Sequence, residues 1–338
     1  MMTKAPTFAR FCRCGSLGID VSKATLEFVG IDNEVVLRRE LANQKTDIEA
    51  VAKSLHKGGY RGKIVCESTG HYHLLLGLVF ARYGLDLRII NPLQSSKHQT
   101  ARIRKTKTDP VDGYVLATMC DTERDLPKAA NLKPKQVLAR LKQGQLQSLD
   151  KQIQRMALSL ATYSETYQKL DLEPGESMQL IEQALAQLKS AKRQLQSELE
   201  SAYLESTQQE EVDRLQALPG FSSLVTTMVA SVFDRDVKSA RSWIAFSGMD
   251  ISIRESGTWK GRGKLTKRGN SFIRKRLYSA ALGAVMNYPE VRHYYDGLKA
   301  GGRNHVEALC IIGRKLLRIA YSILVKGNTY DSTIAFPA

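Results

Sequence analysis

The sequence predicts an α/β domain followed by mainly helical segments, a fold class of α/β plus α. Three observations lead to this prediction. Residues 17–90 alternate short β-branched runs with helical stretches, residues 133–204 are rich in Gln, Leu, Lys, Ala and Ser, and residues 213–330 combine apolar helical stretches with a glycine-rich basic loop. We therefore divide the chain into a leader (1–15), an α/β domain (16–130), a helical segment (131–210), a second compact domain (211–330) and a tail (331–338).

The charge balance restricts the partners of the chain. Its 338 residues include 50 Lys and Arg against 34 Asp and Glu, which gives a formal net charge of +16. Such a charge favours a polyanionic partner, nucleic acid first and an anionic membrane surface second. No apolar run is long enough to span a bilayer, and the segment up to Ser16 lacks the apolar core of a signal peptide, so we expect a cytoplasmic protein.

The five cysteines suggest neither disulfides nor zinc. Their odd number gives no disulfide framework. Cys12 and Cys14 lie close together, but no second Cys/His pair completes a zinc site with them. The surroundings of Cys66, Cys120 and Cys310 are apolar, so we expect these three in the core.

The α/β domain is built from five predicted strands. We expect the leader before them to be loose and basic. Strands are predicted over 17–21, 25–31, 34–41, 63–67 and 85–90, and helices over 47–55, 71–83, from Pro92 onward and over 109–120. The first three strands can pair as hairpins, and the remaining strands alternate with helices. This is the order of the ribonuclease-H-like fold, a mixed sheet with helices on both faces.

Four acids fall at related positions of that fold. Asp20 lies on the first strand, Glu67 ends the fourth, and Asp109 and Asp112 begin the helix over 109–120. The i, i+3 spacing puts the last two on one helix face, where two acids repel unless a cation lies between them. Taken alone, this pair is more simply explained as a helix cap and dipole complement. Together the four acids predict a site for divalent cations that act on a phosphodiester.

A basic run directly precedes the helix over 109–120. Its cationic residues are Lys97, Arg102, Arg104, Lys105 and Lys107. We expect this run to grip a nucleic-acid backbone beside the acids. The alternative, a solvated charged face, is weakened because no acid occurs from Lys97 to Thr108.

The helical segment carries two apolar stripes. They run from Leu138 to Met156 and from Ile181 to Leu199, on either side of a break at 173–175. The second stripe alternates four- and three-residue steps, as a heptad pattern does. We interpret the segment as an antiparallel helical hairpin or a coiled coil, and we favour self-association over a plain helical linker.

The second compact domain joins predicted helices to a basic loop. The helices are predicted over 224–232, 240–247, 267–286 and 306–325. Leu218-Pro219-Gly220 before the first helix is a partial match to a helix-hairpin-helix, which presents backbone amides to a phosphate. The loop over 253–264 is glycine-rich and basic, and we expect it to be too flexible for a core element.

Ser256 in this loop is the second candidate for chemistry. A serine among arginines and lysines can attack a phosphodiester while the cations stabilise the developing charge. No His lies beside it in sequence, and the chemistry alone does not favour it over Ser271 or Ser279, so a phosphate contact or an ordinary loop serine is the simpler explanation. The candidate nucleic-acid contacts of this domain are Arg254, Lys260, Arg262, Lys264, Lys267, Arg268 and Arg274.

Short motifs along the chain resemble those of one family. In the α/β domain they are Gly18-Ile19-Asp20-Val21-Ser22-Lys23, Glu67-Ser68-Thr69-Gly70, Asn91-Pro92 and Lys107-Thr108-Asp109-Pro110-Val111-Asp112. In the second domain they are Leu218-Pro219-Gly220, Phe246-Ser247-Gly248-Met249, Glu255-Ser256-Gly257, Lys267-Arg268-Gly269, Arg274 and Leu277-Tyr278. In this order, over roughly residues 16–330, they resemble the DEDD-type transposases of the insertion-sequence family one-ten, relatives of the Piv and MooV DNA invertases.

The resemblance implies more than the composition does. It implies a RuvC-like catalytic domain that binds Mg²⁺, with Mn²⁺ as a substitute, through Asp20, Glu67, Asp109 and Asp112. It implies that Ser256 attacks DNA and forms a phosphoserine intermediate. It also implies double-stranded donor and target DNA, a structured bridge RNA as guide, and a bacterial dimer of dimers joined by the coiled coil. Gly113 departs from the alanine that the family commonly has after the last acid, and we expect it to loosen that helix.

Three alternatives stay open beside this reading. A hydrolytic RuvC-like junction resolvase or nuclease would use the acids to activate water and Ser256 only as a contact. An actin-like ATPase or sugar kinase also has an Asp on its first strand, but its glycine-rich second phosphate loop is missing and the charge of +16 counts against it. A DNA-packaging protein would explain the charge but not the four placed acids.

Overall fold

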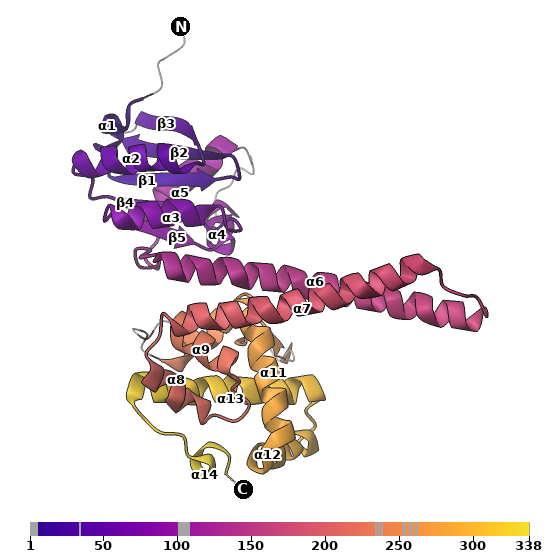
Figure 1. Ribbon diagram of the computed structural model, residues 1–338. Helices are drawn as coiled ribbons and strands as arrows, with labels where there is room; N and C mark the ends of the chain where they lie inside the picture. The colour runs from indigo at the N-terminus through magenta and orange to yellow at the C-terminus, as the bar shows by residue number, and fades with distance from the viewer. Residues whose placement is uncertain are drawn as a thin grey trace. The chain divides into compact units, whose positions relative to one another are not determined.

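The structure is a computed structural model, and it forms two compact units, 1–137 and 138–338 (Figure 1). It describes residues 6–33, 35–100, 109–233, 235, 237, 239–252, 255–256, 259–260 and 263–337. Only the backbone is described at 97, 99–100, 109–111, 255–256 and 259–260. The predicted helical segment lies almost entirely in the second unit. No helix in the described part of the chain is both long and apolar enough to cross a bilayer.

A mixed sheet of five strands organises the first unit. The strands are β1 (Ser16–Val21), β2 (Thr25–Asp32), β3 (Val35–Ala42), β4 (Lys63–Glu67) and β5 (Leu87–Ile90), in the order β3-β2-β1-β4-β5. β1, β2 and β3 pair antiparallel, whereas β4 runs parallel to β1 and β5 parallel to β4. This mixed α/β arrangement is compatible with the predicted ribonuclease-H-like order.

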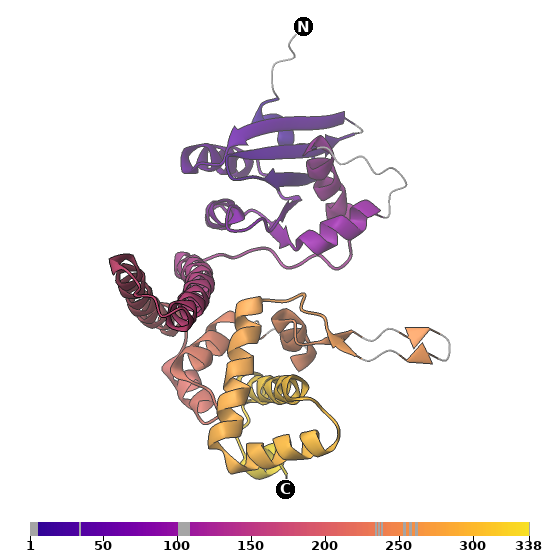
Figure 2. The same ribbon diagram turned by 90° about the vertical axis from the view of Figure 1, so that its right-hand side faces the viewer.

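Helices cover both faces of this sheet (Figure 2). On one face, α2 (Lys45–Lys57) and α3 (His73–Arg82) share a core with the odd-numbered residues of β1, Leu17, Ile19 and Val21. On the other face, α5 (Asp109–Thr122) packs Val115 and Leu116 against Val65 of β4. α4 (Pro92–Thr100) leads from β5 toward α5. Because side chains alternate along a strand, residues 18 and 20 of β1 face α5.

Two glycines let α5 lie unusually close to the sheet. A Cβ atom at Gly18 of β1 would fall 2.1 Å from the carbonyl oxygen of Gly113 and 2.4 Å from the amide nitrogen of Ala117. A Cβ at Gly113 of α5 would in turn fall 2.5 Å from Cγ2 of Val29. Gly113 was expected to loosen the helix. The structure gives it a packing role instead, because the absent side chain leaves room for β2.

The leader is not loose over its described part. α1 (Phe8–Phe11) buries Phe11 completely and Phe8 almost completely in the core beneath α2. The ring of Phe8 lies 5.5 Å from that of Phe28 on β2, and Cys14 is also buried. The expectation of a loose basic leader is therefore wrong from Pro6 onward, because its two phenylalanines supply apolar surface that the sheet buries.

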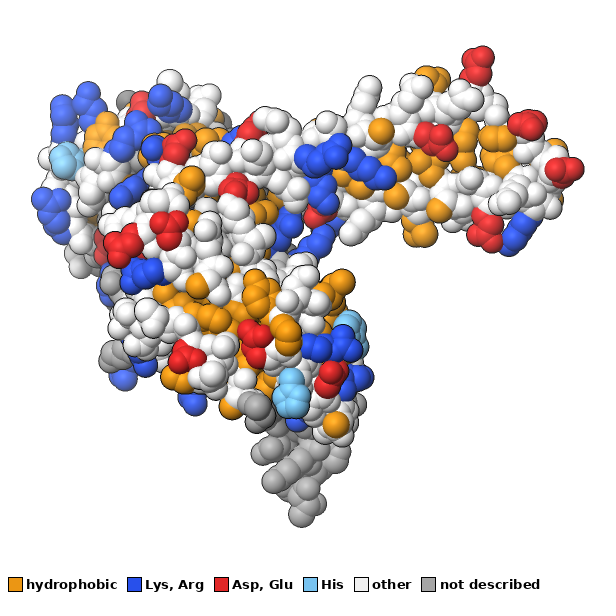
Figure 3. Space-filling model, turned by 60° about the horizontal axis from the view of Figure 1, so that its bottom comes forward, with side chains coloured by type: hydrophobic (Ala, Val, Ile, Leu, Met, Phe, Trp, Pro, Cys, Tyr) orange, Lys and Arg blue, Asp and Glu red, His pale blue; other side chains and the backbone are white. Residues whose placement is uncertain are grey.

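In the second unit, α6 (Pro134–Lys169) and α7 (Glu176–Leu204) form a helical hairpin. Toward its tip, Ile153 and Leu160 of α6 pack against Leu185 of α7. Hydrophobic side chains also reach the surface of the hairpin (Figure 3), and Leu158, Leu170 and Leu180 are more than half exposed. The apolar stripes thus serve both the pairing of the two helices within the chain and an exposed surface.

The base of this hairpin shares a core with the helices that follow. These are α8 (Gln209–Gln216), α9 (Ser223–Val232), α10 (Ala240–Ser247), α11 (Ser271–Asn287), α12 (Pro289–Ala300), α13 (His305–Lys326) and α14 (Ser332–Ala335). Trp243 of α10 is buried between Phe233 and Tyr321. Tyr203 of α7 belongs to the same core, so the hairpin and the helical body form one packed unit.

Two details of this unit differ from the predictions. The helix predicted from Lys267 begins only at Ser271, because the side chain of Asn270 accepts hydrogen bonds from the amides of Phe272 and Ile273 and caps it. The glycine of the partial helix-hairpin-helix, Gly220, serves packing. Its φ is +73°, and a Cβ there would fall 2.0 Å from the carbonyl oxygen of Ala280 on α11.

Asp150 is the centre of a polar joint between α6, α7 and α11. Its side chain is 8% exposed and forms ion pairs with Lys192 at 2.6 Å and Lys275 at 2.8 Å. Burial acts to raise the pKa of Asp150, but the hydrogen bonds and charges of the two lysines outweigh burial and leave the pKa below its ordinary value. The joint therefore requires an ionised Asp150.

We predict that Gly18→Ala lowers the free energy of unfolding by about 1–3 kcal/mol, because the added methyl overpacks the contact between β1 and α5. Urea denaturation followed by circular dichroism measures this. Gly15→Ala is the matched control, since a Cβ at Gly15 meets no atom within 4 Å. Equal stability of the two variants would contradict the close approach.

We predict that Asp150→Asn costs about 1–3 kcal/mol at neutral pH, less than breaking a fully buried pair because both lysines are partly solvated. A carboxyl group with a depressed folded pKa stabilises the protein above its unfolded pKa, about 3.9, and loses this effect as pH falls through the folded pKa. The stability difference between wild type and variant should therefore shrink as the pH falls below about 4 and vanish once the pH lies below the folded pKa. Glu165→Gln, which breaks only an exposed pair with Lys169, serves as control. A difference that persists at low pH would refute the ionic explanation.

Candidate active site

Two of the predicted acids lie side by side at the end of adjacent strands. β1 and β4 run parallel with Ile19 opposite Cys66, so the next residues, Asp20 and Glu67, are neighbours. Asp20 shares the strand face of Gly18, which meets α5, and Glu67 shares the face of Val65, which packs under α5. Both carboxylates therefore belong to the face of the sheet that α5 covers.

Glu67 is held by a hydroxyl group from α4. Oγ of Ser95 donates a hydrogen bond of 2.7 Å to Oε2 of Glu67, and it also lies 2.9 Å from the carbonyl oxygen of Pro92. Ser95 is only 5% exposed. A buried hydroxyl that contacts a carboxylate restricts its rotamers, so Ser95 sets the direction in which the remaining oxygen of Glu67 points.

The other two acids begin α5, beside the same end of the sheet. Asp109 is the first residue of α5 and Asp112 lies in its first turn, immediately before Gly113. The close contact of Gly113 with Gly18 brings this turn to β1, two residues before Asp20. The side chain of Asp109 lies outside the described residues. The backbone nevertheless brings all four acid positions to one region of the first unit.

A fifth acid, Glu27, shares this region. It is the register partner of Asp20 on β2, and its Oε2 would lie 3.6 Å from a Cβ atom at Gly113. Glu27 also forms an ion pair of 3.7 Å with Arg38. Glu27 therefore adds negative charge beside Asp20, and Arg38 partly balances it.

The donor set at this end of the sheet suits a hard cation. Carboxylate oxygens are the ligands that Mg²⁺ and Mn²⁺ prefer. Among the side chains that the structure describes, no three Asp, Glu, His or Cys groups already converge closely enough to share one metal ion. The chemistry of the ligands fits a divalent cation, while a closed cage would also require the carboxylate of Asp109.

The basic run before α5 lies largely outside the described residues. This applies to Arg102, Arg104, Lys105 and Lys107, while Lys97 belongs to the helix α4 with only its backbone described. α4 also carries Ser95 and His98, and Nδ1 of His98 lies 3.2 Å from Oε1 of Glu123, the residue that directly follows α5. The run therefore continues from a helix that is anchored to the acidic end of the sheet.

The loop with Ser256 contains paired strands. β6 (Ile251–Ser252) pairs with β9 (Lys264–Leu265), and further along the same segment β7 (Glu255–Ser256) pairs with β8 (Trp259–Lys260). Ser256 is opposite Trp259, and its side chain lies outside the description, as do Arg254 and Arg262. Short strand pairs therefore lie within the predicted glycine-rich loop, and the β7–β8 pair extends from the β6–β9 pair as a β-hairpin (Figure 2).

The remaining basic candidates differ in their surroundings. Lys264, Lys267 and Arg268 are exposed on the segment between β9 and α11. Arg274 instead donates hydrogen bonds to the carbonyl oxygens of Ser247 at 3.2 Å and Gly269 at 3.4 Å, which braces the turn before α11. Arg274 therefore has a structural role that its basic character alone does not indicate.

Sequence reasoning missed Ser95 and Glu27 of this site, and also Arg303, which lines a cationic pocket in the second unit. The contact of Ser95 with Glu67 joins residues 28 positions apart and carries no motif. Glu27 could have been found from the hairpin register, which places it opposite Asp20. Arg303 lies in the short connection before α13 and belongs to no basic run.

Comparisons with known proteins match two parts of the chain to transposase families. Residues 17–163, which include all four predicted acids, match the DEDD-type IS110 family described as transposase. Residues 212–296, which include Ser256, match the transposase IS116/IS110/IS902 family.

Two relatives belong to insertion elements. A 43.6 kDa protein of insertion element IS110 from Streptomyces coelicolor is 25% identical over 88 residues, which cover 26% of this chain and 22% of the relative. A 42 kDa protein of insertion element IS900 from Mycobacterium paratuberculosis is 24% identical over 111 residues, covering 32% of this chain and 28% of the relative. The chain therefore matches less than a third of the length of either relative. With two family matches in the expected order along one sequence, we conclude that this chain belongs to the IS110 family of transposases.

Proposed function

We propose that the protein is an insertion-sequence DNA transposase that cleaves and exchanges DNA strands. One observation carries the proposal. Asp20 and Glu67 are neighbours on parallel strands, on the face covered by the helix that begins with Asp109 and Asp112, in a chain that belongs to the IS110 family. Converging carboxylates beside a basic run suit phosphodiester chemistry.

Asp20, Glu67, Asp109 and Asp112 would hold Mg²⁺ or Mn²⁺, with Ser95 fixing the direction of Glu67. A cation bound there would polarise the scissile phosphate and stabilise charge on its oxygens. The residues of the chain hold the carboxylates in place. Glu67 is restrained by a buried hydroxyl, and the first turn of α5 is fixed by its contact with β1. A well-fixed site is what a reaction dominated by electrostatic stabilisation requires.

Ser256 would act as the nucleophile on the DNA. Its Oγ forms a bond to phosphorus as the bond from phosphorus to a sugar oxygen breaks. The serine loses its hydroxyl proton and the departing sugar oxygen gains one, so a phosphoserine linkage and a free sugar hydroxyl result. Attack of another strand's hydroxyl on that linkage restores the serine and completes the exchange without an external energy source.

The positive net charge of the chain and the exposed leucines of its helical hairpin suggest its partners. We propose double-stranded donor and target DNA and a structured bridge RNA, because the chain carries a net charge of +16. We also propose that the α6–α7 hairpin joins copies of the chain into a dimer of dimers. Leu158, Leu170 and Leu180 support this, since each is more than half exposed along the hairpin.

We predict that wild-type protein incubated with Mg²⁺ and its labelled element-end DNA gives a protein–DNA adduct that survives denaturing electrophoresis. Ser256→Ala should lose the adduct and strand exchange, because the attacking oxygen is gone, while circular dichroism stays unchanged. Ser279→Ala is the control, since Ser279 is an exposed serine of α11 whose hydroxyl donates only within its own helix. Strand cleavage without an adduct in wild type, unaffected by Ser256→Ala, would point to hydrolysis instead, as in a RuvC-like resolvase.

A further inference from the structure

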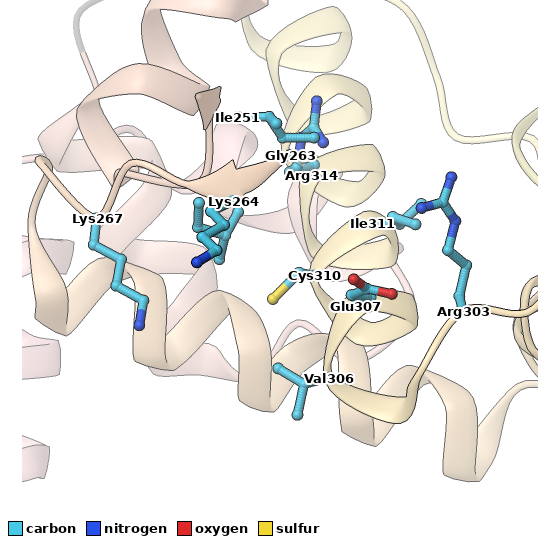
Figure 4. A pocket seen from close by; sticks show the side chains of 11 residues that line it. Ile251, Gly263, Lys264, Lys267, Arg303, Val306, Glu307, Cys310, Ile311 and Arg314 are labelled. Carbon is cyan, nitrogen blue, oxygen red and sulfur yellow. The ribbon is translucent and has the colours of Figure 1, made fainter. Parts of the chain in front are cut away.

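A pocket of about 400 Å³ lies in the second unit beside the root of the serine-bearing hairpin (Figure 4). One wall is the β6–β9 pair, where Ile251 is the register partner of Leu265. The other wall is the first half of α13, with Val306, Cys310 and Ile311. The volume falls within the roughly 300–1,000 Å³ typical of ligand sites. Four aliphatic residues of the lining, which we call the aliphatic floor, are Ile251, Leu265, Val306 and Ile311.

Four cations line the same pocket. They come from three different segments: Lys264 and Lys267 around β9, Arg303 from the connection before α13, and Arg314 from α13 itself. In Figure 4, Lys264 and Lys267 lie on one side of Cys310 and Arg303 on the other. Glu307 is the single acid in the lining, and its side chain also accepts the amide of Asn304 in the helix cap. The rim is therefore strongly positive.

Arg314 has a buried hydrogen-bond donor that lacks an acceptor among the described residues. This donor is its Nε. Burial lowers the pKa of Arg314, and the nearby charge of Arg318 lowers it further, while Asp250 opposes them. A buried N–H group without an acceptor is costly, so an acceptor or anionic group beside Nε of Arg314 would be stabilising.

An aliphatic floor with a cationic rim suits a nucleotide, which combines an apolar base with anionic phosphates. A nucleobase is flat and apolar on its faces, and its flanking phosphates are anionic. Duplex nucleic acid keeps its bases stacked inside and offers only phosphates to such a site. A base can enter the pocket only when it is unstacked.

We propose that this pocket takes one unstacked nucleotide of a nucleic-acid strand, with the base against the aliphatic floor and the adjoining phosphates against the lysines and arginines. The proposal rests on the nucleic-acid substrate of the proposed function and extends it. Because β6 and β9 continue into the segment that carries Ser256, a nucleotide held here would fix the strand at the root of that hairpin.

The test uses the full-length protein in EDTA and a single-stranded DNA of about a dozen nucleotides with one central 2-aminopurine. The fluorescence of 2-aminopurine rises when it unstacks, and anisotropy of an end label gives the Kd. Val306 is an exposed residue of the lining, so Val306→Trp fills the pocket with an apolar side chain and alters no charge. Val306→Ala is the matched control. The same probe as RNA distinguishes the two sources of a nucleotide.

We expect the fluorescence to rise with wild type and with Val306→Ala. With Val306→Trp the rise should be lost and the Kd should weaken roughly tenfold, because the base loses its apolar contact with the aliphatic side chains. Arg314→Gln should reduce the slope of log K against log salt by roughly 0.7, the value for one single-strand phosphate contact.

Three results would overturn the proposal. An unchanged Kd for Val306→Trp, or a retained fluorescence rise, shows that no base enters the pocket. A change in sedimentation of Val306→Trp without a change in Kd assigns the pocket to a segment of a second copy. Absence of binding by wild type to both the DNA and the RNA probe refutes this inference. The proposed function is tested separately, because adduct formation at Ser256 on double-stranded element-end DNA would leave it intact.

Discussion

The contact of α5 with β1 and β2 is the constraint on which the candidate active site depends. Gly18 of β1 faces the backbone of α5 and Gly113 of α5 faces Val29 of β2, and a methyl group at either position would overlap atoms of the opposite element. This distance fixes the first turn of α5, and with it the backbone of Asp109 and Asp112, beside the strand ends that carry Asp20 and Glu67. A larger residue at either glycine would move the helix off the sheet and separate the acids. The apolar core around Val115 and Leu116 supplies the energy that holds the helix there.

Much of the secondary structure of the first unit could be predicted from its sequence. Runs of β-branched residues indicate strands and apolar periodicity indicates helices, and both patterns are visible within a few consecutive residues. The strand positions and the four acids follow from such local signals. The contact of Ser95 with Glu67 could not be predicted, since it depends on where α4 turns after β5. The same holds for Phe8 and Phe11, whose burial depends on an open patch of the sheet core. Near α11, the cap at Asn270 overrides the helical pattern of the basic residues before it.

The second unit combines a packed helical body with the segment that carries Ser256. Its helical hairpin is fastened to α11 by Asp150, which pairs with lysines of α7 and α11, and by Gln143, whose amide donates a hydrogen bond of 3.1 Å to the helix cap Asn270. The β6–β9 pair and the cationic pocket lie on the same helical body, beside α13. Thus the helical hairpin is connected to α11 and to its cap through short polar contacts. Such connections explain how a long hairpin can hold a fixed direction relative to its own helical body.

The central claim is that the acids brought together by α5 form a divalent-cation site. Electron paramagnetic resonance measures it directly, because free Mn²⁺ gives a sharp six-line spectrum that binding broadens. Titration of the full-length protein should show bound Mn²⁺ that is lost in Asp20→Asn and Glu67→Gln, weakened about 10–100-fold in Ser95→Ala, and kept in Glu123→Gln, an acid just beyond the C-terminal end of α5. Equal Mn²⁺ binding by wild type, Asp20→Asn and Glu67→Gln would contradict the claim.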